Sequence, residues 1–167
     1  IALFFLYFVI SNMIYSTPQK PDIITYKGIE YTIDLYLLED YFNKYPEKRP
    51  QSEYFYTNLR RGYFATYEIV DNKIVVKDIQ VYLPTKENNY SLLSKSVMKE
   101  TFPNDERIVI DWYTGILELP CPSKKRSRLF NIRKKPKNYL LLKVNGGHLE
   151  KEKKVKQEAL QFLKRAR

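Results

Sequence analysis

Hydrophobic and polar residues alternate with a period of two from Asp22 onward, which predicts half-buried strands. Residues 23–26 and 29–34 flank the pair Lys27-Gly28, and a two-residue loop there pairs Tyr26 with Ile29 and Ile24 with Tyr31. The opposite face of this hairpin is mostly Thr, Glu and Asp. The predicted core-facing residues are Ile24, Tyr26, Ile29, Tyr31 and Ile33.

Three more hairpins are expected. Residues 63–70 and 73–83 flank Asp71-Asn72, a pair that tolerates positive φ. Residues 107–120 form a hairpin if Gly115 supplies the left-handed residue of a three-residue loop, which places Trp112 opposite Ile116 and Asp111 on the other face, solvated or bonded to backbone. Residues 139–144 pair back with residues 148–150 through Asn145-Gly146-Gly147.

Helical spacing appears at three places. Residues 36–45 carry an apolar face of Leu37, Leu38, Tyr41, Phe42 and Tyr45, and Pro46 ends the pattern. Residues 92–100 are a weaker helix candidate. Residues 151–167 are predicted to form a basic amphipathic helix, with Val155, Ala159, Phe162, Leu163 and Ala166 on one face. The predicted fold class is α+β: an antiparallel sheet of successive β-hairpins with two or three helices, the last at the C-terminus.

The chain divides into three predicted regions. Residues 1–16 are almost wholly apolar, with no charge before Lys20, so they are expected to be a signal peptide or an N-terminal membrane anchor. The alternative is a buried first strand or core helix, because ten to fourteen apolar residues also suit a core helix. Residues 17–150 form one α+β domain, and residues 151–167 the terminal helix. The expected location is exported, periplasmic or membrane-anchored; cytoplasmic is the alternative.

The net charge of +10 is concentrated near the C-terminus. Residues 123–167 carry a net charge of +13, whereas residues 1–122 sum to −3. Residues 123–137 hold eight cations and no anion, which is typical of a segment that attracts polyanions. The candidate partners are lipid headgroups or surface polysaccharide, and nucleic acid if the chain is cytosolic; a solvated loop without a partner stays open. The candidate anion-binding residues are Lys124, Lys125, Arg126, Arg128, Arg133, Lys134 and Lys135.

Arg60 and Arg61 precede the second hairpin and are also candidate anion-binding residues. Two guanidinium groups at the start of a strand can bind a carboxylate or phosphate bidentately. The alternative is internal pairing with Glu68, Asp78 or Asp111 across the sheet.

Candidate catalytic chemistry is sparse. The acid pairs Glu39-Asp40 and Asp105-Glu106 are interpreted as solvated surface, since acids are mostly exposed. His148 has no partner at metal-ligand spacing, and the single Cys121 excludes an internal disulfide. No nucleotide-binding, serine-hydrolase or zinc-protease motif occurs. We therefore assign no catalytic residue, no metal and no cofactor from the sequence.

The segments 26–120 resemble a family of small bacterial proteins of unknown function. The matching pieces, in order, are YKGIEYTI, LEDYF, RRGYFATYEIVDNKIVVKDI and DWYTGILELP. The chain departs from the family pattern at Tyr67, where the family has tryptophan, and beyond Pro120, where a basic segment replaces a Gly-Tyr-rich stretch. The resemblance implies one domain for the hairpins and supplies no activity.

The expected function is therefore that of a non-enzymatic exported or membrane-tethered binding or structural domain whose basic segment contacts an anionic surface. A cytosolic nucleic-acid or other polyanion binder is the alternative, and a hydrolase with an unrecognised site is the third interpretation.

Overall fold

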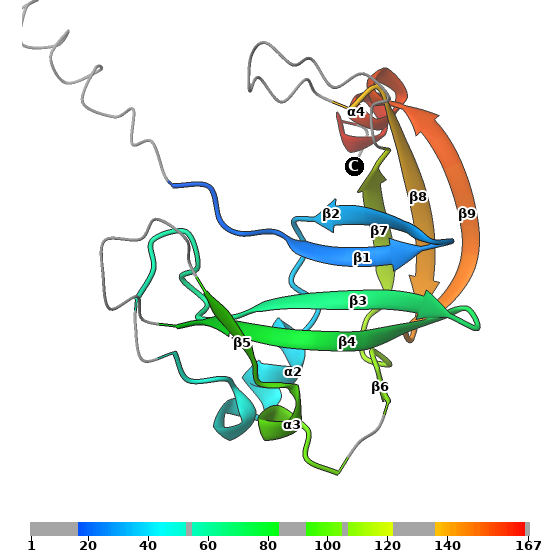
Figure 1. Cartoon of the computed structure of the whole chain (residues 1–167). Coiled ribbons are helices and arrows are strands. Elements are labelled where there is room, and N and C mark those ends of the chain that lie inside the picture. The colour runs from blue at the N-terminus through cyan, green and yellow to red at the C-terminus, as the bar shows by residue number, and fades with distance from the viewer. Residues whose placement is uncertain (1–16, 53–54, 84–92, 105–106, 122–135, 166–167) are drawn as a thin grey trace, which may run out of the picture.

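The computed structural model describes residues 17–52, 55–83, 93–104, 107–121 and 136–165 (Figure 1). Within these residues, nine strands form one mostly antiparallel sheet, accompanied by three short α-helices and one 3-10 helix, so the α+β class is confirmed. The helices are α2 (Glu39–Lys44), η1 (Pro46–Lys48), α3 (Met98–Thr101) and α4 (Gln157–Arg165).

Three of the predicted hairpins form, although the third turns on Gly146-Gly147 alone and its second strand extends beyond residue 150. They are β1 (Asp22–Tyr26) with β2 (Ile29–Ile33), β3 (Phe64–Val70) with β4 (Lys73–Tyr82), and β8 (Asn138–Asn145) with β9 (His148–Lys156). Each turn has positive φ at both loop residues, the conformation whose twist matches paired strands. In the first hairpin Ile24, Tyr26, Tyr31 and Ile33 are buried as predicted, whereas Ile29 is 44% exposed.

The sheet order is β2-β1-β3-β4-β9-β8-β7, with β7 at Gly115–Pro120. The two short strands β5 (Ser94–Ser96) and β6 (Ile108–Val109) both pair with β4. The pairing of β1 with β3 is parallel, which departs from the expectation of an entirely antiparallel sheet. A parallel pair needs a long connection, and residues 27–63 supply it through β2, α2 and η1.

The strands form two layers that enclose the core. In Figure 1, β7, β8 and β9 run across the direction of β1 to β4, and β2 lies against β7. Side chains from both layers meet in one buried cluster, among them Ile24, Tyr67 and Ile79 from the first and Leu117 and Leu142 from the second. Helices α2 and α3 lie at one end of the molecule and α4 at the other (Figure 1).

The predicted hairpin over residues 107–120 is wrong. Strand β6 pairs with β4, through Val75 opposite Val109, and β7 pairs with β8. Trp112 therefore does not face Ile116: its indole Nε1 donates to the Leu37 carbonyl at 2.8 Å. The partner strands β4 and β8 lie outside residues 107–120. Local alternation within those residues does not indicate which other strands they pair with. Asp111 is exposed, as expected.

The helix boundaries also need correction. Helix α2 is shorter than residues 36–45, and residues 94–101 divide between β5 and α3 instead of forming one helix. At the C-terminus, residues 151–156 continue β9 because their backbones pair with β8, so Val155 is a buried strand residue. In α4, Leu160 is buried and Phe162 is 73% exposed, the reverse of the predicted helical face.

Candidate functional site

A fully buried carboxylate lies at the start of β1. Asp22 is in phase with Ile24 and Tyr26, so the alternation of the strand directs it into the core. Its Oδ1 accepts a hydrogen bond from the Ala65 backbone N–H at 2.9 Å and from the Arg61 guanidinium, and the Tyr67 hydroxyl donates to Oδ2 at 3.2 Å. Ala65 and Tyr67 belong to β3, so Asp22 joins the two parallel strands where their pairing begins.

Arg61 is the countercharge of this site. Its side chain is 8% exposed and forms an ion pair with Asp22. The Nε group donates to the Tyr63 carbonyl at 2.6 Å, and Nη2 donates to the Lys20 carbonyl at 3.2 Å. The guanidinium carbon lies 3.8 Å from the centroid of the Tyr36 ring, within cation–π range. Arg61 thus connects the segment before β1 to the start of β3.

A second carboxylate extends the polar network toward α2. Glu39 accepts hydrogen bonds from Arg49 at 3.1 and 2.9 Å and from the buried Tyr63 hydroxyl at 2.7 Å. Burial acts to raise the pKa of Glu39, but the hydrogen bonds from Arg49 and Tyr63 outweigh it and the pKa is lowered. Glu39 is therefore a partner of the core and not the solvated acid that the sequence suggested, whereas its neighbour Asp40 is exposed.

Asp22 forms a structural ion pair with Arg61, but its burial opposes the charged form of the carboxylate. Desolvation raises its pKa from 3.8 to about 6, although Arg61, the Ala65 N–H and the Tyr67 hydroxyl all act in the opposite direction. Within the described residues, no buried side-chain nitrogen or oxygen lacks a hydrogen-bond partner. A satisfied network of this kind fixes the register of β1 on β3 and does not present a reactive group to a ligand.

We expect Asp22 to make folding stability depend on pH in a specific direction. Because the folded-state pKa of about 6 exceeds the unfolded value of 3.8, the folded protein binds this proton more tightly. The contribution of Asp22 is fully present below the unfolded pKa and is lost as the pH rises through the folded pKa. Relative to Asp22→Asn, wild-type stability should fall by about 3 kcal/mol in total as the pH rises from well below 3.8 to well above 6, with most of the fall between pH 4 and pH 7.

Urea unfolding of both proteins across this pH range measures the effect, and the difference between them cancels other titrating groups. A matched control is Asp34→Asn, which makes the same chemical change at an exposed acid beyond β2. A flat difference for Asp22→Asn would show that Asp22 has an ordinary pKa in the folded protein.

The structure separates the two arginines that the sequence placed together. Arg61 is committed to Asp22, so internal pairing occurs with an acid other than Glu68, Asp78 or Asp111. Arg60 is exposed, and its backbone N–H donates to Gln19 Oε1 at 3.0 Å. An anion-binding role for Arg60 stays a prediction.

The remaining predicted anion-binding residues lie outside the described residues. These are Lys124, Lys125, Arg126, Arg128, Arg133, Lys134 and Lys135. The described residues on either side of them are adjacent, since the Cys121 N–H donates to the Asn138 carbonyl at 3.0 Å. The Gln157 N–H in turn donates to the Lys137 carbonyl at 3.0 Å, so Lys137 lies at the start of α4.

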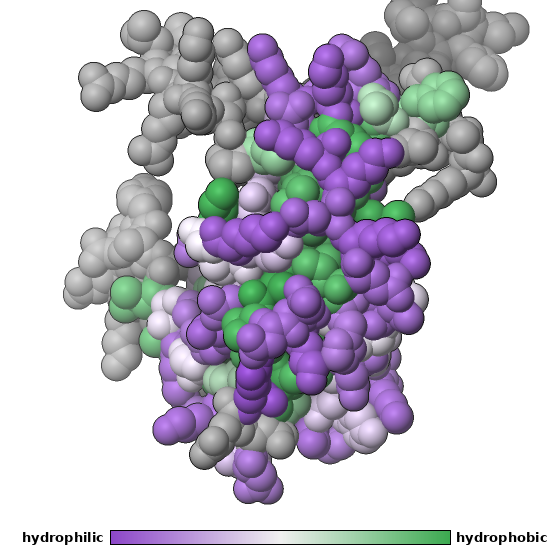
Figure 2. All heavy atoms as spheres, turned by 90° about the vertical axis from the view of Figure 1, so that its right-hand side faces the viewer, coloured by the Kyte–Doolittle hydropathy of each residue, from purple (hydrophilic) through white to green (hydrophobic). Residues whose placement is uncertain are grey.

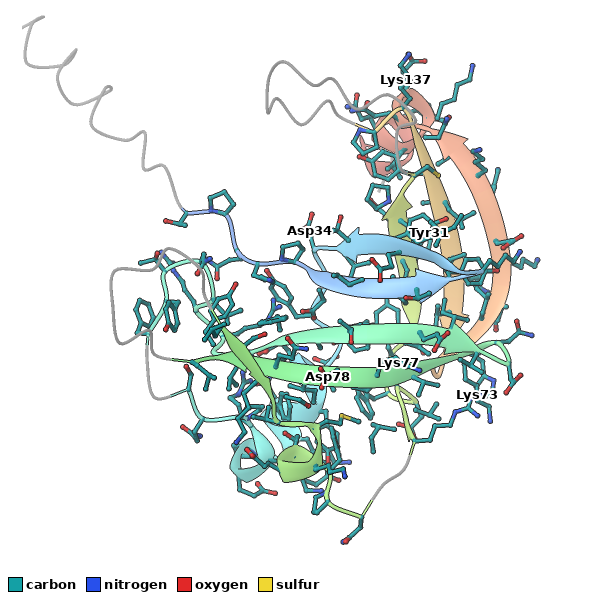
Figure 3. The ribbon with its side chains drawn as sticks, viewed as in Figure 1. Tyr31, Asp34, Lys73, Lys77, Asp78 and Lys137 are labelled. Carbon is teal, nitrogen blue, oxygen red and sulfur yellow. The ribbon has the colours of Figure 1, made fainter. Side chains whose placement is uncertain are left out.

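Strand β9 brings further cations to this end of the molecule. Its two acids already have partners: Glu150 binds Lys143 at 2.5 Å, and Glu152 binds Lys27 at 2.8 Å. Lys153, Lys154 and Lys156 are exposed and form no ion pair with the part of the chain that the structure describes. Figure 2 shows hydrophilic residues surrounding a narrow hydrophobic strip on the side formed by β8 and β9, and Figure 3 places Lys137 at the same end as α4.

The lysines also suit an exposed strand edge. Strand β9 pairs with β4 only at Lys73 opposite His148, so along most of its length one edge has no strand partner among the described residues. Lysine on such an edge opposes pairing with another chain. This role explains exposed charge on β9 but not Lys137 or the run of cations that precedes it in the sequence.

Neither Asp22 nor Glu39 was predicted from the sequence as a member of a buried network. The available signal was phase: Asp22 occupies the same face as Ile24 and Tyr26 in an alternating strand. Its partner Arg61 had no comparable signal, because the two residues are 39 positions apart.

Within the described residues, no cluster of His, Cys, Asp or Glu is arranged to hold a metal ion. None of the helices in these residues has the length and apolar character needed to cross a membrane. The predicted signal peptide or anchor at residues 1–16 lies outside the described part of the chain.

Comparison with known proteins found no matching family model, curated protein or solved structure. The resemblance of residues 26–120 to a bacterial family therefore stays a prediction.

Proposed function

We propose that this chain is a non-enzymatic binding domain whose basic end lies against an anionic membrane surface. The basic end consists of Lys153, Lys154, Lys156 and the basic segment 123–137, of which Lys137 is a described residue. The supporting observation is that exposed lysines gather at one end while the acids of β9 are already paired. Export or membrane tethering through residues 1–16 is part of the same proposal.

The expected binding free energy follows from the number of lysines at the membrane surface. Each lysine close to an anionic leaflet contributes about 1 kcal/mol, and the attraction falls off within a Debye length. Lys153, Lys154 and Lys156, together with the eight cations of residues 123–137, therefore exceed the cluster of about four to eight cations that is typical of anionic-lipid binding. Lipid phosphate is favoured over a single small anion, because the cations are spread over a surface and do not converge on one point.

We expect the variant with Lys137, Lys153, Lys154 and Lys156 replaced by glutamine to bind phosphatidylserine-containing vesicles at least about tenfold more weakly than wild type. Co-sedimentation at two salt concentrations measures this, and higher salt should weaken wild-type binding. Phosphatidylcholine vesicles should bind neither protein. The matched control replaces Lys44, Lys77, Lys95 and Lys99 with glutamine, which removes the same charge from elsewhere on the surface.

Equal loss of binding in both quadruple variants would show that net charge alone is responsible and would refute a defined basic end. A fluorescent oligonucleotide titration under the same conditions tests the nucleic-acid alternative. Tight, salt-dependent oligonucleotide binding without vesicle binding would replace the membrane proposal.

A further inference from the structure

A groove with a volume of about 500 Å³ lies at the end of the molecule opposite the basic end. It runs between α2, the residue that follows α3, and the segment from β6 to Trp112. Four aromatic side chains form its wall: Tyr41, Tyr45, Phe102 and Trp112. Cavities of this size with aromatic walls and a few polar groups are the usual form of small-ligand sites.

Ring contacts and one hydrogen bond fix the positions of the aromatic side chains in the wall. The Tyr41 ring centroid lies 5.0 Å from those of Tyr45 and Trp112 and 5.3 Å from that of Phe102. The hydrogen bond from Trp112 Nε1 to the Leu37 carbonyl fixes the indole, and Phe102 is buried. Tyr41, Tyr45 and Trp112 are only partly buried, so a preorganised aromatic surface faces the groove.

The charges that line the groove cancel. Asp40 and Asp111 are balanced by Lys44 and Arg107. Both carboxylates are exposed, and neither forms a hydrogen bond or ion pair with another described residue. Arg107 is shared with the β3–β4 turn, where it lies 3.5 Å from Asp71. The groove thus offers hydrogen-bonding groups of both kinds without a net charge.

We propose that this groove binds a neutral sugar ring. The C–H face of a pyranose stacks on aromatic rings, whose faces carry partial negative charge. Its hydroxyls donate to carboxylates such as those of Asp40 and Asp111 and accept from ammonium or guanidinium groups such as those of Lys44 and Arg107. Because the lining charges cancel, the site favours a neutral polyol over a phosphate or a polyanion.

An organic cation fits the groove less well than a sugar. Lys48 already lies 5.6 Å from the Tyr41 ring centroid and 5.7 Å from that of Tyr45, and its Nζ donates to the Tyr41 hydroxyl at 3.0 Å. Lys48 is not among the residues that line the groove, whereas Lys44 does line it and its Nζ lies 5.3 Å from the Tyr45 ring centroid. A quaternary ammonium ligand at Tyr45 would therefore lie next to a like charge, which a neutral sugar would not.

The test uses Trp112, the single tryptophan of the chain, as the reporter. Purified full-length protein is titrated with cellotriose, maltotriose and triacetylchitotriose while the indole emission is followed, and calorimetry gives the affinities. At least one trisaccharide should give a saturable change with a Kd on the order of 1 mM. Tetramethylammonium and inositol hexaphosphate serve as cationic and anionic probes and should give none.

Two groove variants should weaken sugar binding. Tyr45→Ala removes one stacking surface and should raise the Kd at least about tenfold, as expected for the loss of one aromatic platform. The double variant Asp40→Asn, Asp111→Asn keeps side-chain size and should raise the Kd about fivefold or more, because charge-assisted hydrogen bonds to the hydroxyls are lost. The matched controls Phe55→Ala and Asp34→Asn lie outside the groove lining and should bind as wild type.

The outcomes are distinguishable from those of the vesicle experiment. The quadruple lysine variant of the basic end should bind sugar normally, and Tyr45→Ala should bind vesicles normally. The sugar proposal is overturned if no trisaccharide gives a saturable response at about 10 mM. It is equally overturned if both groove variants bind as wild type, or if only a charged probe changes the Trp112 emission.

Discussion

Replacement of Arg61 by methionine is expected to lower the free energy of unfolding by about 3–5 kcal/mol at neutral pH. The methionine fills much of the same volume but leaves the fully buried Asp22 without its countercharge. It also removes the hydrogen bonds to the Tyr63 and Lys20 carbonyls. Urea unfolding measures the loss, and the adjacent Arg60→Met, at an exposed position, is the matched control and should change stability by less than about 0.5 kcal/mol.

Two further measurements separate loss of the ion pair from loss of packing. Arg61 lowers the pKa of Asp22, so its removal raises that pKa further, and the cost of Arg61→Met should be smaller at pH 5 than at pH 8. The double variant Asp22→Asn, Arg61→Met should recover part of the lost stability, because no charge is left buried. An equal cost at both pH values, with no recovery, would assign the effect to packing alone.

Replacement of Gly147 by alanine is expected to be the most damaging single-methyl change in the hairpin turns. Gly147 has a φ of +73°, and a Cβ there would lie 1.9 Å from the Ile110 carbonyl oxygen. That oxygen belongs to backbone, and Gly147 itself donates to the Tyr113 carbonyl at 2.8 Å and accepts from the Ile74 N–H at 3.0 Å. Neither side of the contact can move without breaking hydrogen bonds between the two layers.

The control is Gly28→Ala, because Gly28 has the same φ of +73° but has no atom within 4 Å of the added Cβ. Gly28→Ala should cost about 1 kcal/mol, which is the strain of a left-handed alanine. Gly147→Ala should cost at least about 2 kcal/mol more, because overpacking adds to the same strain. Chemical unfolding of both variants gives the comparison, and similar costs would mean that the backbone at Ile110 yields readily.

The two proposed surfaces lie at opposite ends of the fold. The basic end is built from β8, β9 and the residues next to α4, whereas the aromatic groove is built from α2, Phe102 and the residues around β6 (Figure 1). The polar network of Asp22, Arg61 and Glu39 lies in the core of the first layer and joins β1, β3 and α2. Together these features describe a scaffold in which the proposed membrane-facing surface and the proposed ligand groove lie apart.

The hairpin strands are predictable from the sequence, but their orientation within the sheet is only partly so. In β4 the inward-facing positions change parity, from Ile74 and Val76 to Ile79 and Val81. The register shift opposite Thr66 and Tyr67 accounts for this, since Asp78 and Val76 pair with consecutive residues of β3 and Lys77 is left between them. A β-bulge of this kind is not visible in a simple alternation pattern.

The candidate groove was also only partly predictable from the sequence. Asp111 and Trp112 were singled out from the sequence, and both line the groove. Their neighbours Tyr41 and Tyr45 were predicted only as the apolar face of a helix. The contact between that helix and Trp112 depends on β6 pairing with β4 instead of β7, and no local pattern indicated that pairing.

By itself, the sequence determined the α+β class, the positions of three hairpins, and the accumulation of positive charge toward the C-terminus. These features are local, because loop residues that tolerate positive φ set the register of the strands that they join. Only the tertiary structure decided the parallel pairing of β1 with β3, the burial of Asp22 against Arg61, and the partners of β6 and β7. Those choices depend on hydrogen bonds and desolvation between segments far apart in the chain, and alternation within one segment does not encode its distant partner.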